Sequence, residues 1–132
     1  MKKAFFLPLA LSVLGLFTAP SVLAQQSTLD KIRSTGVVTM GVRESSGALS
    51  YTLGDGKYAG FHVEICNNVL RDIQKQLNLK SLDIKYVPVT SQNRIPLLQN
   101  GTVDIECGST TNNATRQKDV AFAVTKIGRA HV

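Results

Sequence analysis

The stretch "TSQNRIPLLQNGTVDIECGSTTNN", residues 90–113, predicts a short helix, a short strand and a polar loop, in that order. Thr90 or Ser91 can cap the helix, and Gly101 stands just past its end. The run at residues 103–106 is typical of a short strand. A helix that leads directly into a strand favours an α/β fold.

The loop at residues 107–113 contains no large apolar side chain. One interpretation is structural: Thr111 could cap a helix that starts near Asn112, because hydroxyl side chains cap helices readily. The other interpretation is that the hydroxyl groups hold a ligand, and both can apply together. We expect this loop to enter a helix, and residues 120–124, "VAFAV", to form a further strand.

The rest of the chain continues the alternation of helices and strands. Val37–Val42 is a continuous run rich in β-branched residues, as in a strand buried on both faces. Between residues 61 and 77 apolar side chains recur every three or four positions, which indicates a helix. The expected elements are helices at 27–34 and 61–77, strands at 37–42 and 82–89, and a hairpin at 49–61 with its turn at 54–56. This order predicts an α/β fold with a mostly parallel sheet flanked by helices.

The first segment is typical of a secretory signal peptide. Lys2 and Lys3 precede an almost unbroken apolar run at residues 4–17, and Ala24 closes a motif of the kind that signal peptidase reads. We expect residues 1–24 to be removed on export. The competing interpretation, a membrane anchor, needs about 20 apolar residues, and the run is shorter. The residue at the cut is Ala and not Cys, so nothing suggests a lipid anchor.

The last segment, residues 126–132, has no periodicity. Ile127–Val132 looks like the translation of a short sequencing adapter, so we expect a non-native tail produced by read-through. The alternative is a genuine short C-terminus. A natural stop codon after Val132 in the genomic DNA would contradict the read-through hypothesis.

The charge of the exported chain is modest. The full sequence has 15 basic and 9 acidic residues, and loss of Lys2 and Lys3 reduces its net charge from +6 to +4. The remaining basic residues are scattered, and the chain has no Trp. We therefore expect no nucleic-acid partner despite the high isoelectric point.

The two cysteines, Cys66 and Cys107, leave three possibilities open. They could form a disulfide, which export permits and which would stabilise the fold by roughly 3–4 kcal/mol if unstrained. Cys107 could instead pair with a cysteine in further sequence, or both could be buried thiols. Because His62 and His131 are the only histidines and no CxxC motif is present, we expect no metal site and no cofactor.

The candidate ligand site lies at the carboxyl ends of the strands, where open α/β sheets bind ligands. Arg43 follows the first strand, Ser91 and Arg94 follow the second, and Ser109 and Thr111 follow the third. Arginine forks and helix N-termini suit a small ligand that carries a carboxylate. Taken singly, Ser91 and Thr111 could be helix caps and Arg43 a solvated surface residue. The five residues together are the stronger pattern, because all three loops fall at one edge of the sheet.

Three segments together carry a resemblance to a known family. They are "STLDKIRSTGVVTMGVRESS" (27–46), "AGFHVEIC" (59–66) and "TSQNRIPLLQNGTVDIECGSTTNNATRQKDVAF" (90–122). The chain resembles the periplasmic polar amino-acid-binding proteins of ABC transporters, solute-binding protein family 3, and within them the glutamate/aspartate-binding branch. The resemblance covers nearly all of residues 25–125.

The resemblance implies a periplasmic-binding-protein-like fold, in which two α/β lobes close over one amino acid. Residues 25–125 would be a truncated N-terminal lobe, with the second lobe missing. It further implies a monomer in the periplasm that binds an acidic amino acid and delivers it to the membrane permease of an ABC importer. Since each lobe would supply about half of the contacts, we expect the 132-residue chain alone to bind weakly or not at all.

The resemblance also implies roles for the site residues. Arg94 would hold the α-carboxylate of the ligand, with Ser91, Ser109 and Thr111 beside it. Arg43 would meet the side-chain carboxylate. At His62 many relatives of the family carry an acid, and we interpret this position as structural.

Two rival functions remain at this point. An enzyme on the same fold, of the dehydratase or cell-wall lytic type, needs catalytic groups, and the sequence has no paired carboxylates, Ser-His-Asp or Cys-His arrangement in a recognisable setting. We therefore expect a binding protein and not an enzyme. A ligand-sensing ectodomain is the other rival, because similar lobes feed signals to membrane proteins.

Overall fold

The structure is a computed structural model that describes residues 27–123 of the 132. The expected signal peptide, residues 1–24, and the expected non-native tail, residues 126–132, lie outside the described residues. The elements in chain order are α1 (Thr28–Thr35), β1 (Val37–Val42), β2 (Tyr51–Gly54), β3 (Lys57–Ala59), α2 (Phe61–Gln76), β4 (Asp83–Pro88), α3 (Arg94–Gln99), β5 (Ile105–Glu106) and the 3₁₀ turn η1 (Arg116–Lys118).

The main sheet confirms the predicted α/β class. Its strand order is β4-β1-β5, and both pairs are parallel. β1 and β4 pair along their whole lengths, from Val37 opposite Asp83 to Val42 opposite Pro88. Parallel neighbours need a crossover connection, and helices supply it here. The expected hairpin forms separately as the antiparallel pair β2–β3.

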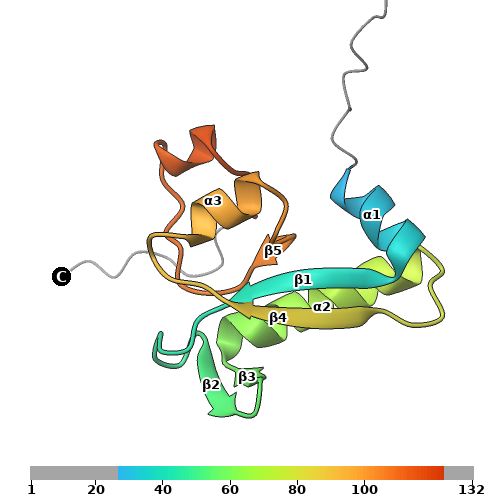
Figure 1. The fold of residues 1–132 in the computed structure, drawn as a ribbon, viewed down its shortest axis with the longest axis horizontal. Helices are drawn as coiled ribbons and strands as arrows, with labels where there is room; N and C mark the ends of the chain where they lie inside the picture. The colour runs from blue at the N-terminus through green and yellow to red at the C-terminus, as the bar shows by residue number, and fades with distance from the viewer. Residues whose placement is uncertain (1–26, 124–132) are drawn as a thin grey trace, which may run out of the picture.

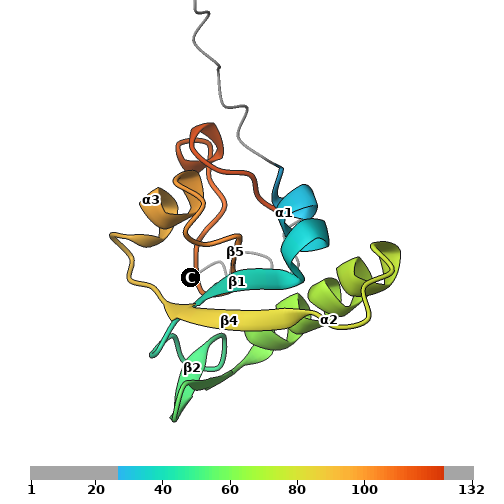
Figure 2. The same cartoon turned by 45° about the vertical axis from the view of Figure 1, so that its right-hand side comes forward.

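The sheet is covered on both faces (Figures 1 and 2). α2 lies along one face, whereas α3 lies on the other. Side chains alternate along a strand, so β1 presents Val38, Met40 and Val42 to one side, and all three join Val63 and Leu70 of α2 in the buried apolar cluster. These five side chains are each at most 1% exposed. The apolar character of β1 on both faces follows from this double cover.

Gly41 of β1 faces the side opposite α2. A Cβ atom at this position would lie 3.0 Å from Val103 Cγ1 and 3.3 Å from Val89 Cγ1. The loops beyond β4 and α3 can therefore approach β1 closely because the strand has no side chain there.

α1 is capped at both ends. The Ser27 hydroxyl accepts a hydrogen bond from the backbone N–H of Asp30 at 3.2 Å, and Gly36 ends the helix with a left-handed φ of 67°. Gly60, directly before α2, has a φ of 128°, and a Cβ atom there would lie 2.5 Å from the carbonyl oxygen of Leu49. Within residues 27–123, no helix is both long enough and apolar enough to cross a membrane.

Two predictions for the last part of the chain are wrong. The helix expected after residue 109 is only the single turn η1, at whose start the side-chain oxygen of Asn113 accepts from the backbone N–H of Arg116 at 2.9 Å. The residues before it lack the apolar periodicity that would pack a longer helix onto the sheet. The strand expected at residues 120–124 is absent over residues 120–123, and Val124 lies outside the described residues. A strand needs a neighbour to pair with, and within the described chain this segment has none.

The packing of α2 can be tested at two neighbouring positions. Leu70 is 1% exposed, whereas Val69 is 43% exposed. Leu70→Ala removes buried methyl groups and leaves a cavity, so we expect the free energy of unfolding to fall by about 2–5 kcal/mol. Val69→Ala, the control, should change it by less than about 0.5 kcal/mol. Urea denaturation followed by circular dichroism measures both, and equal losses would show that α2 does not pack through Leu70.

Candidate functional site

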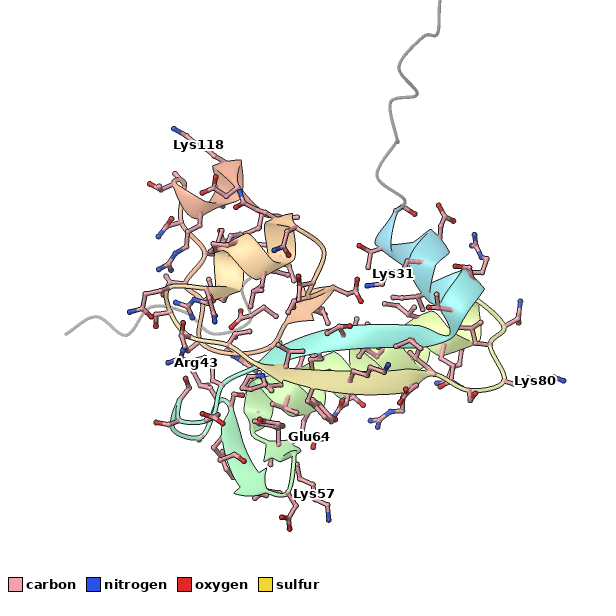
Figure 3. The ribbon with its side chains drawn as sticks, in the orientation of Figure 1. Lys31, Arg43, Lys57, Glu64, Lys80 and Lys118 are labelled. Atoms are coloured by element: carbon pink, nitrogen blue, oxygen red, sulfur yellow. A yellow bond between two sulfur atoms is a disulfide. The ribbon has the colours of Figure 1, made fainter. Side chains whose placement is uncertain are left out.

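The structure brings three loops together at the carboxyl edge of the sheet. Arg43, directly after β1, donates from Nη1 to the carbonyl oxygen of Val89, after β4, at 3.0 Å. Its Nε donates to the hydroxyl of Ser46 at 3.1 Å. That hydroxyl lies 3.2 Å from the hydroxyl of Ser109, after β5. These loops lie together because parallel strands end at the same edge of a sheet. Figure 3 shows Arg43 at this edge and Lys80 beyond the opposite end of the sheet.

The loop after β1 is fixed by a buried serine. The backbone N–H of Arg43 donates to the Ser50 hydroxyl at 2.9 Å, and that hydroxyl donates to the carbonyl oxygen of Arg43 at 3.0 Å. Ser50 is fully buried. A buried hydroxyl that bonds both backbone groups of one residue holds the start of its side chain in place.

Arg94 is the most buried charged residue at this edge. It is the first residue of α3 and is 5% exposed. Its Nη1 lies 4.0 Å from Oε1 of Glu106, whose side chain is also buried. Within residues 27–123, neither the Nε and Nη1 atoms of Arg94 nor Oε1 of Glu106 has a hydrogen-bond partner. Buried donors are ordinarily paired, so this guanidinium has capacity left for a further acceptor.

Burial shifts the pKa values of this pair in opposite directions. Burial raises the pKa of Glu106 above its ordinary value, and the neighbouring Thr110 hydroxyl and the charge of Arg94 act against that shift. Burial likewise lowers the pKa of Arg94, while the charge of Glu106 acts against it. Arginine nevertheless remains protonated in proteins, so the site keeps a permanent cation.

Gly108 packs closely against the side chains of Arg43 and Glu106. A Cβ atom at this position would lie 2.5 Å from Cγ of Arg43 and would overlap the Glu106 carboxylate. On its other side, the carbonyl oxygen of Gly108 is hydrogen-bonded to Nδ1 of His62. The preceding residue, Cys107, is joined by a disulfide to Cys66 of α2. Of the possibilities that the sequence left open for the cysteines, the structure therefore has the Cys66–Cys107 pair.

The two remaining predicted residues are less enclosed. Ser91 is exposed in the turn that precedes α3. The hydroxyl that accepts a backbone bond in this turn belongs to Thr90, from the N–H of Asn93 at 3.2 Å. Thr111 is also exposed, and its carbonyl oxygen accepts from Nη1 of Arg116 at 3.0 Å. The interpretation of Thr111 as a helix cap is wrong, because no helix starts near residue 112.

Several residues at this edge escaped the sequence analysis. Ser46 links the loops after β1 and β5. Gly108 packs against Arg43 and Glu106, and Glu106 lies near Arg94. The Thr110 hydroxyl is buried and has no hydrogen-bond partner in the described part of the chain. One signal in the sequence could have indicated Glu106 as a site residue. It is a glutamate at the end of a buried strand, directly before a loop of small residues.

One hollow on the described surface, of about 180 Å³, is lined by Arg43, Glu44, Ser45, Val89 and Thr90, and so opens at the candidate site. Another, of about 530 Å³, lies beside α1. Its charges are satisfied within the protein, because Lys31 Nζ is 2.9 Å from both carboxylate oxygens of Asp104. Among residues 27–123, no group of three or more potential metal ligands comes together.

The chain belongs to the family described as bacterial extracellular solute-binding proteins, family 3, which matches residues 38–130. It is 52% identical over 102 residues to a glutamate/aspartate import solute-binding protein of Escherichia coli, a match that covers 77% of this chain and 34% of the relative. It is 50% identical over 115 residues to an L-glutamate/L-aspartate-binding protein of Pseudomonas aeruginosa, covering 85% and 38%. The chain thus spans about a third of the length of these relatives.

Solved structures and a more distant relative extend the comparison. The fold is similar to that of the solute receptor for L-cysteine of Neisseria gonorrhoeae, with a TM-score of 0.63 and 27% identity. This similarity covers 74% of the present chain and 38% of the receptor. A cyclohexadienyl dehydratase of Pseudomonas aeruginosa is 28% identical over 125 residues, which is 94% of this chain and 44% of the enzyme. The proteins that this chain is similar to therefore include both binding proteins and an enzyme.

A Glu106→Gln variant tests the buried pair. Because the pKa of Glu106 is raised in the folded chain, the folded state holds its proton above the ordinary glutamate value of 4.5, where the unfolded state has lost it. The stability that this proton contributes is therefore lost as the pH rises from 4.5 through the raised pKa of Glu106. We take the free energy of unfolding of the wild type and subtract that of the variant, and we expect this difference to decrease from pH 4.5 upward. Urea denaturation at several pH values measures it, and a constant difference would contradict the shift.

Proposed function

We propose that this chain is the N-terminal lobe, residues 25–125, of the substrate-binding subunit of an ABC amino-acid importer, and that it binds glutamate or aspartate. The observation that carries the proposal is the pair of arginines at one sheet edge. Arg43 and Arg94 flank a single carboxylate, Glu106, and two donor atoms of Arg94 are unpaired within residues 27–123. The names of the relatives at 50–52% identity support the same ligand class.

Arg94 is the proposed partner of the ligand α-carboxylate. A planar fork with unused donors accepts a carboxylate bidentately, and such charge-assisted bonds are stronger than neutral ones. Ser109 and Thr111 follow β5 at the same edge and would contribute hydroxyl or backbone donors beside it. Ser91, exposed in the turn before α3, would add a further hydroxyl group to the site.

Arg43 is the proposed partner of the side-chain carboxylate. Its Nε and Nη1 atoms are held by Ser46 and by the carbonyl of Val89, which fixes the direction of the guanidinium. Its Nη2 takes no part in these two bonds and would meet the ligand. A neutral side chain would leave this cation without a counter-charge when the site closes, and an unpaired charge removed from water is costly. This cost favours acidic amino acids over neutral ones.

The proposed context is the periplasm, after removal of residues 1–24, with a second lobe completing the site and a membrane permease as partner. We propose a monomer. Nucleic acid is not a proposed partner: Figure 3 shows Lys57, Lys80 and Lys118 pointing outward at separate places on the fold, and Lys31 is ion-paired with Asp104. Binding to phosphate backbones depends on clustered cations.

Catalysis is the less supported alternative. A dehydratase is among the relatives, and Glu106 is a buried carboxyl with a raised pKa, as some general acids are. Its carboxylate nevertheless lies under Gly108 and near Arg94, which suits charge balance inside the lobe. We therefore propose binding without turnover, so that NMR after incubation should recover the amino acid unchanged.

Isothermal titration of the full-length protein, recovered by resequencing the locus, tests the ligand. We expect heat with glutamate and aspartate, and none with glutamine or arginine, because only the acids supply a second carboxylate. Heat with glutamine or arginine alone would show that the site binds a different ligand from the one proposed. No heat with any of the four would refute the proposal.

Two variants of Arg94 test its role in the same titration. Arg94→Ala should abolish detectable binding, since removing one partner of a buried charge pair costs several kcal/mol. Arg94→Lys keeps the charge but not the fork, so it should bind more weakly than the wild type and retain its fold. Arg33→Ala, on the exposed face of α1, is the control. Unchanged affinity in Arg94→Lys and Arg94→Ala would remove this residue from the site.

The 132-residue chain itself provides a further test. With one lobe, the ligand would keep part of its surface in water, and charge-assisted bonds weaken when they are exposed. We expect no saturation below millimolar glutamate. A submillimolar dissociation constant for the purified chain would show that this lobe alone forms the site.

A further inference from the structure

Helix α2 holds the loop after β5 at two successive residues. Cys66 is joined by a disulfide to Cys107, and Nδ1 of His62 is hydrogen-bonded to the carbonyl oxygen of Gly108. His62 and Cys66 are four residues apart in a helix, so both lie on the same face, one turn from each other. A single helix face thus contacts the first two residues of the proposed ligand loop, residues 107–111.

The opposite side of the same segment contacts the site. Gly108 packs so closely against Arg43 and Glu106 that a methyl group does not fit there. The next hydroxyl, that of Ser109, lies 3.2 Å from the Ser46 hydroxyl that holds Nε of Arg43. A displacement of this segment away from α2 would therefore move a proposed ligand contact and the support of an arginine together.

Apart from α2, the loop has two further anchors near its start: the backbone N–H of Cys107 donates to the carbonyl oxygen of Gly41 at 2.8 Å, and the Ser109 hydroxyl lies 3.2 Å from that of Ser46. Residues 107–113 form no helix or strand, and β5 before them has only two residues. α2, by contrast, is anchored independently, because Val63 and Leu70 are buried against β1. The loop therefore takes part of its position from this anchored helix.

We propose that α2 positions the ligand loop through His62 and the Cys66–Cys107 disulfide, and that affinity for the amino acid depends on the redox state of this disulfide. The proposal rests on the proposed function, which makes residues 107–111 a ligand loop. His62 and the cysteines are positioning residues, because they act on the ligand through the loop.

A dithiol can reduce the Cys66–Cys107 disulfide in a step in which atoms and electrons balance. The dithiol supplies two electrons and two protons, the sulfur–sulfur bond breaks, Cys66 and Cys107 become thiols, and the reductant becomes a disulfide. Cys107 is 2% exposed, whereas Cys66 is only partly buried, so attack at the sulfur of Cys66 is the more accessible route. After reduction, the His62 bond alone would tie the loop to α2.

The experiment uses the full-length protein and two readouts. Titration with glutamate gives the dissociation constant, and amide hydrogen exchange of residues 108–111 in the ligand-free protein reports the order of the loop. The proteins are the wild type with and without a dithiol, the double variant Cys66→Ser/Cys107→Ser, and His62→Leu. His62→Asn is the rescue variant, because the asparagine amide can occupy the place of Nδ1. Glu64→Leu, exposed on the same helix, is the control.

We expect His62→Leu to weaken binding about three- to tenfold, the net value of one hydrogen bond, and to speed exchange in the loop. His62→Asn should restore both to within about twofold, which a purely space-filling role for His62 would not produce. Reduction should weaken binding and speed exchange in the wild type, while a dithiol should leave the double variant unchanged. Glu64→Leu should match the wild type.

Failure of this inference and failure of the proposed function give different results. If reduction and His62→Leu leave both affinity and loop exchange at wild-type values, α2 does not position the loop and the inference is wrong. If the oxidised wild type binds no acidic amino acid, the proposed function fails instead, and the exchange data still decide whether α2 orders residues 107–111. Should the double variant not fold, reduction of the wild type provides the same comparison.

Discussion

The structure depends on the pairing of β1 along both of its edges. β4 occupies one edge and β5 the other, and both run parallel to β1. Parallel pairing sends each connection back across a face of the sheet, so the helices take the faces and all three strands end together. Residues that are more than 60 positions apart, such as Ser46 and Ser109, meet only for this reason. Nothing in their local sequence would bring them together.

The same edge concentrates charge that the fold does not balance fully. Two arginines share one buried carboxylate, and two donor atoms of Arg94 have no partner among the described residues. A protein that leaves buried donors unpaired loses stability. A ligand that bound only the folded chain would return part of that stability by mass action. The arrangement is therefore poor as a stabilising device and well suited to holding an anion.

Much of this architecture could be predicted from the sequence. The β-branched run at residues 37–42 and the three- and four-residue spacing in residues 61–77 are strong local signals, and both elements form within one residue of the predicted limits. The alternation of helices and strands then indicates a parallel sheet. The segment after residue 109 lacks such signals, because "TNNAT" has no apolar periodicity. The apolar run at 120–124 is typical of a strand, but a strand forms only where a partner strand can pair with it. The positions of Arg43 and Ser109 followed from strand order. The burial of Glu106 against Gly108 did not, because it depends on packing between separate loops.

The Cys66–Cys107 disulfide has a consequence for the integrity of the chain. With a sequence separation of 41 residues, it encloses β4, α3 and β5 in one covalent ring. The exposed turn at residues 91–93 lies inside that ring, and exposed turns are where proteases cut first. A molecule nicked there would remain one particle of unchanged mass apart from one added water. Its two peptides would separate on a gel only after the sample had been reduced.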